Sequence, residues 1–121
     1  MQSTLSHYVI LISAAWYLIN GILHDIFVIR NHKTGYDKDL MRLLMDGHVL
    51  ILSGLLMLIS WMMLREHNQW GAIIGFVIGT GMIVYCVMIF PFLKSFFTLF
   101  ISIAVALVCV WLFFHYRIIQ R

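Results

Sequence analysis

Four long apolar runs constrain the fold of this chain more than any other feature of its sequence. They cover residues 6–29, 40–64, 70–90 and 93–116, and three short connectors separate them. A helix needs about 20 apolar residues to cross a hydrocarbon layer ~30 Å thick, and each run has that length. Lipid offers the backbone no hydrogen-bond partners, and the runs lack the alternation of barrel strands, so all four are predicted to be helices.

Composition supports a membrane location. Charged residues make up 11% of the 121 residues and hydrophobic residues 63%, whereas soluble domains carry roughly 25% charged residues. A soluble chain of this size could not bury so much apolar surface. The short connectors predict antiparallel neighbours, so we expect a single all-α integral membrane domain over residues 1–121, built as an up-down bundle of four transmembrane helices.

Basic residues lie at the ends of the apolar runs and give an expected orientation. Five of the eight fall on the side of the first and third connectors: Arg30, Lys33, Lys38, Arg42 and Lys94. The positive-inside rule therefore favours both termini on the non-cytoplasmic side of a cell or inner membrane, with insertion in both orientations as the alternative. This pattern is typical of anchoring in the lipid bilayer, and no nucleic-acid partner is expected.

Chemically active side chains gather where the first run ends and the second begins. Asn20, His24 and Asp25 lie near the end of the first run, and Asp46 and His48 lie near the start of the second. At ~1.5 Å per residue, most of them fall roughly 6–12 Å below the same membrane interface. Ionisable groups at such depth are rare and usually functional.

Helical angles predict which of these groups meet. Asn20 and His24 are four residues apart and share a face, whereas Asp46 and His48 are separated by about 200° around their helix. We therefore expect Asn20, His24 and Asp46 to converge on a ligand- or proton-binding site. Tyr85 of the third run lies at a matching depth and is included in that site.

Metal or haem binding is an alternative use of the same region. His24 and His48 could ligate a haem between the first two helices, or a divalent metal together with Asp25 or Asp46. The sequence contains no standard motif for either cofactor and requires none. Asp25 is expected to turn away from the site, and His48 to face a neighbouring helix or another subunit.

Small and weakly polar residues form a stripe along each run. Gly71, Gly75 and Gly79 recur every four residues in the third run, a spacing that lets membrane helices approach closely. We expect these glycines to mediate helix packing, and the chain to form a homo-oligomer or to be a subunit of a larger membrane complex. The two cysteines differ in depth by roughly 15 Å, so they are expected to be free thiols.

Three functions remain open on this basis. The first is a small oligomeric membrane protein that binds a proton, ion or small solute at the His/Asp site for transport. In length and number of spans the chain resembles the small multidrug-resistance exporters, although its first run contains no glutamate. The second is a non-catalytic accessory or assembly subunit, and the third is a haem- or metal-binding redox protein. Soluble-enzyme motifs are absent from the sequence, which argues against an enzyme.

Overall fold

The computed structural model describes residues 2–91 and 94–119, and within these ranges it contains four α-helices and no strand. They are α1 (Gln2–Asn31), α2 (Lys38–Arg65), α3 (Gln69–Ile89) and α4 (Phe96–Ile119). The predicted all-α fold with four helices is confirmed. The sequence placed the start of the fourth helix at residue 93, which lies outside the described residues.

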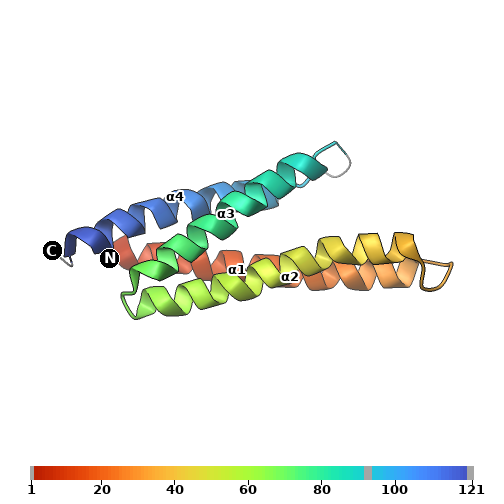
Figure 1. Cartoon of the computed structure of the whole chain (residues 1–121), viewed down its shortest axis with the longest axis horizontal. Coiled ribbons are helices and arrows are strands. Elements are labelled where there is room, and N and C mark those ends of the chain that lie inside the picture. Colours follow the sequence, from red (N-terminus) through yellow and green to blue (C-terminus); the bar gives the residue numbers. More distant parts are fainter. Residues whose placement is uncertain (1, 92–93, 120–121) are drawn as a thin grey trace.

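All four helices are long and apolar enough to cross a membrane, so the chain is an integral membrane protein. Their lengths differ, because α1 and α2 contain 30 and 28 residues whereas α3 and α4 contain 21 and 24. At 1.5 Å per residue, α1 and α2 exceed the ~30 Å hydrocarbon layer by more than two turns. The α1–α2 hairpin therefore projects beyond α3 and α4 at one end (Figure 1).

The helices form two antiparallel hairpins, α1–α2 and α3–α4. They lie together at the end that carries both termini and diverge toward the first and third connectors (Figure 1). Two hydrogen bonds join the hairpins. Trp16 Nε1 donates to Thr98 Oγ1 at 3.2 Å in a partly buried bond, and the buried hydroxyls of Tyr17 and Ser102 lie 2.7 Å apart. Ser102 Oγ donates to the Thr98 carbonyl at 2.7 Å, so the Tyr17 hydroxyl must donate to Ser102.

The glycine stripe of α3 packs inside the chain. Gly71, Gly75 and Gly79 are all buried. A side chain at Gly71 would meet Ser60 and Leu64 of α2, and one at Gly79 would meet the backbone of α4. Ser60 Oγ also donates to the Gly71 carbonyl at 2.6 Å. This face of α3 therefore holds α2 and α4 and is not available to another copy or partner.

The first connector is organised by Asp37, which caps α2. Its carboxylate accepts hydrogen bonds from the Leu40 amide at 2.8 Å and from the Thr34 hydroxyl at 2.7 Å. These donors favour the charged carboxylate and lower the pKa of Asp37 from 3.8 to about 2. Gly35 has a φ of 77°, a conformation that glycine adopts without strain, and it turns the chain toward this cap.

Candidate functional site

The backbones of α1 and α2 approach closely because glycines line their interface. A Cβ at Gly21 would lie 2.7 Å from the Gly47 carbonyl oxygen, and one at Gly54 would lie 3.0 Å from the Ala14 carbonyl oxygen. Such distances leave no room for side chains, so the two helices touch through their main chains. This packing decides which neighbouring side chains of α1 and α2 face each other.

Asp25 lies at the centre of the resulting polar cluster. Its carboxylate occupies the space over Gly47 where a side chain would otherwise begin. One oxygen, Oδ2, lies 3.1 Å from His48 Nδ1 of α2, and the other, Oδ1, lies 3.5 Å from His24 Nδ1 of α1. A single carboxylate thus faces two imidazoles, one from each helix, and we call these three residues the His24/Asp25/His48 site.

The position of His48 defines its tautomer. Nδ1 lies 2.8 Å from the Leu44 carbonyl as well as 3.1 Å from Asp25. Both neighbours are acceptors, so Nδ1 must carry a hydrogen, and in the neutral imidazole Nε2 then has a free lone pair. The His48 side chain is 65% exposed, so it is accessible from outside the bundle.

Two polar atoms of this site are buried without a hydrogen-bond partner. They are Asp25 Oδ1 and His24 Nδ1, and the Asp25 side chain is only 13% exposed. A buried polar group that lacks a hydrogen bond costs free energy. A proton shared between the two atoms, or a shift of His24 by a few tenths of an ångström, would satisfy both of them.

Asp46 makes a separate contact with α3. It lies close enough to Tyr85 for the carboxylate and the phenol to interact. Asp46 and His48 therefore face different helices, as their 200° separation requires. Neither Asn20 nor His24, both partly buried, has a hydrogen bond or ion pair to Asp46 among the described residues.

The structure thus groups the sequence-predicted residues differently from the expectation. Asp25 and His48, which were both expected to face away from the Asn20/His24/Asp46 site, contact each other, whereas His24 lies beside Asp25 rather than Asp46. Of the residues expected to share one site, Asp46 and Tyr85 lie near each other. The reason is the rotation of α1 about its axis, which is set by Gly21 packing on Gly47. Polar stripes alone do not indicate these glycine contacts.

The geometry does not fit the haem and metal alternatives. Among the described residues, no group of three His, Cys, Asp or Glu side chains is arranged to hold a metal ion. A haem between His24 and His48 would have to occupy the space between the two imidazoles, and the Asp25 carboxylate already lies there. The two cysteines, Cys86 and Cys109, are buried free thiols.

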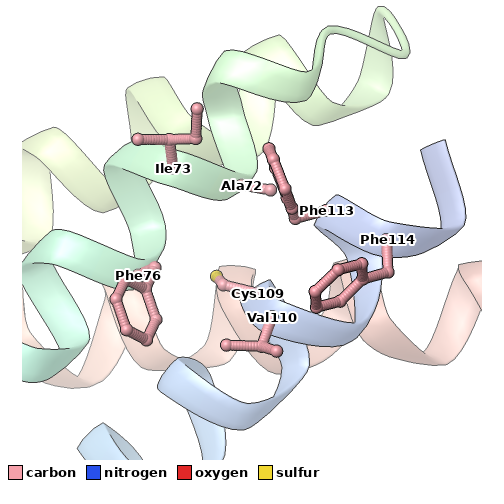
Figure 2. A pocket seen from close by; sticks show the side chains of 7 residues that line it. All are labelled: Ala72, Ile73, Phe76, Cys109, Val110, Phe113 and Phe114. Atoms are coloured by element: carbon pink, nitrogen blue, oxygen red, sulfur yellow. The ribbon is translucent and has the colours of Figure 1, made fainter. Parts of the chain in front are cut away.

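An apolar groove lies on the opposite hairpin, between α3 and α4. Figure 2 shows its walls, with Ile73 and Phe76 on α3 and Val110, Phe113 and Phe114 on α4. Its volume is about 220 Å³. Cys109 contributes a thiol to its lining, and no residue with a carboxylate, an imidazole, an amine or a hydroxyl lines it.

Comparison of the chain with protein-family models, with curated proteins and with solved structures found no match.

Proposed function

We propose that this small membrane protein binds a proton at the His24/Asp25/His48 site and uses it in transport across the membrane. The observation that carries the proposal is one buried carboxylate held between two imidazoles, with an unpartnered oxygen and an unpartnered ring nitrogen facing each other. Groups of this kind inside transmembrane helices are typical of proton relays.

The arrangement gives each side chain a role. The exposed imidazole of His48 would take a proton at Nε2 while Nδ1–H holds its bonds to Leu44 and Asp25. The imidazolium so formed would be stabilised by the Asp25 carboxylate. His24, on the other side of the same carboxylate, would receive the charge next.

Exposure of His48 also supports an oligomer. Its imidazole is largely exposed on the outside of the bundle. It lies at about the same depth as the contact between Asp46 and Tyr85, which is near the end of α3. In a lone copy this polar ring would face lipid or the headgroup boundary, which is unfavourable. A second copy, or a larger partner, that covered His48 would enclose the site.

A structural role is the second candidate, and one observation favours it. Asp25 fits over Gly47 and contacts His48 across the close α1–α2 interface, which is how polar pairs stabilise membrane bundles. In that case the cluster would serve only to fix α1 against α2, and the chain would act as an accessory subunit.

Proton flux into liposomes separates the two roles. The purified chain is reconstituted with an internal pH-sensitive dye, and a potassium diffusion potential drives proton entry. We expect flux above that of protein-free liposomes, and a loss of at least tenfold in Asp25→Asn and His48→Gln. Asp39→Asn, in the exposed first turn of α2, is the matched control and keeps the flux. Wild-type flux equal to that of empty liposomes would refute transport.

A further inference from the structure

A polar groove lies at the end of the bundle opposite the His24/Asp25/His48 site, between the start of α1 and the end of α2. Its lining residues are Thr4, His7, Tyr8, Leu11, Trp61 and Arg65, and its volume is about 410 Å³. We infer that this groove binds the phosphate of an anionic phospholipid, with Arg65 as the main ligand. This binding would be distinct from the proton site.

Charge at this end of the bundle favours an anion. Arg65 and Arg117 lie at this end against a single acidic side chain among the described residues, Glu66, while the four aspartates lie toward the other end. Within the described part of the chain, no carboxylate lies within ion-pairing distance of Arg65. The guanidinium therefore has its charge available for an external partner.

Arg65 is held in an orientation suited to phosphate. Its guanidinium carbon lies 5.0 Å from the centre of the Trp61 ring. Contact with an aromatic face leaves the in-plane N–H groups free, and their fork matches two phosphate oxygens. Thr4 and Tyr8 also line the groove, and hydroxyl groups of this kind can donate to the remaining phosphate oxygens.

His7 forms a fixed wall of the groove. Its Nε2 lies 3.0 Å from the Tyr116 hydroxyl, which donates to the Leu64 carbonyl at 3.4 Å. His7 must therefore donate through Nε2 to Tyr116, and this chain of bonds connects α1, α4 and α2. The wall is preorganised, so little ordering of the protein is needed when a ligand binds.

The depth of the groove points to a lipid rather than to free phosphate. Arg65 is the last residue of α2 and Thr4 lies in the first turn of α1, which is the level of the headgroups. Leu11 lies about 10 Å further along α1 at ~1.5 Å per residue, and with Trp61 it gives the groove an apolar inner part. A phospholipid presents its phosphate and its acyl chains in this order.

Native mass spectrometry of the full chain released from neutral detergent tests this inference. Phosphatidylglycerol and phosphatidylcholine are added in equal amounts, and inorganic phosphate is added in a separate arm. We expect the wild type to retain phosphatidylglycerol in preference to phosphatidylcholine. Arg65→Gln should retain phosphatidylglycerol roughly tenfold more weakly, because a charge-assisted pair is lost. Inorganic phosphate at the same concentration as the lipid should not displace phosphatidylglycerol. Arg117→Gln, which lies at the same end and does not line the groove, is the control and retains the lipid.

Three results would overturn the inference. They are equal retention of the two lipids by the wild type, unchanged retention of phosphatidylglycerol in Arg65→Gln, and displacement of the lipid by inorganic phosphate. Helical circular dichroism of each variant shows whether the fold is intact. If Arg65→Gln proves unfolded, Tyr8→Phe and Trp61→Leu are tested in its place. Full retention of phosphatidylglycerol by both of these variants would then contradict the site.

Discussion

The carboxylate of Asp25 on α1 lies where a side chain at Gly47 on α2 would begin. The contact between Asp25 and Gly47 thus belongs both to the packing of the two helices and to the candidate site. A change at Gly47 must therefore affect both the stability of the hairpin and the geometry of the site.

Replacing Gly47 with alanine tests this relationship. The added methyl would collide with the Asp25 carboxylate and lie 3.0 Å from the Gly21 carbonyl oxygen, so α1 and α2 must separate. Overpacking of this kind costs about 1–3 kcal/mol of the free energy of unfolding, measured by denaturation in mixed micelles. Gly81→Ala is the control, because nothing lies within 4 Å of a Cβ there. Equal stability of Gly47→Ala and the wild type would show that the contact is looser than described.

Removing the Tyr17 hydroxyl should weaken the joint between the two hairpins. Tyr17 is fully buried and donates to Ser102 of α4 at 2.7 Å. Hydrogen bonds of this kind in membrane proteins contribute about 0.6–1.7 kcal/mol, so we expect Tyr17→Phe to lower the free energy of unfolding by that amount. Tyr36→Phe, at a position 82% exposed in the first connector, should have no effect. A neutral Tyr17→Phe would mean that this hydrogen bond adds nothing measurable to the joint between α1 and α4.

The cap of α2 should respond to acid. Because the pKa of Asp37 is lowered from 3.8 to about 2, its stabilising contribution is complete above about pH 4 and is lost as the pH falls toward 2. The protection factor for amide exchange at Leu40, which donates to this carboxylate, should therefore fall over that interval. Asn is also a good cap but does not titrate, so Asp37→Asn should show no such step. The same step in both proteins would assign it to another group.

Sequence reasoning recovered the helices and their approximate depths. Length and continuous hydrophobicity define four spans because lipid permits little else. Connector lengths then fix the order of the neighbouring helices. Depth along each helix follows from the rise per residue, which explains why Asp46 and Tyr85 were placed at one level and are found together.

Rotation of each helix about its axis was not recoverable in the same way. The serine and histidine stripes suggested that Asn20, His24 and Asp46 converge, yet the α1–α2 contact is set by Gly21, Gly47 and Gly54. The spacing of these glycines within one helix does not show which residues of the other helix they contact. The clearest available signal was Gly47, which directly precedes His48 and marks the face of α2 nearest α1.

The proposed site rests on the contact between the Asp25 carboxylate and His48 Nδ1 across the α1–α2 interface, which nuclear magnetic resonance of the reconstituted protein can measure. The protein is labelled with ¹³C at the aspartate carboxyl carbons and with ¹⁵N in the histidine rings. We predict a through-space correlation between the Asp25 carboxyl carbon and His48 Nδ1 that is lost in Asp25→Asn and kept in Asp39→Asn. A wild-type spectrum without that correlation would show that the two side chains are not in contact and would overturn the proposal.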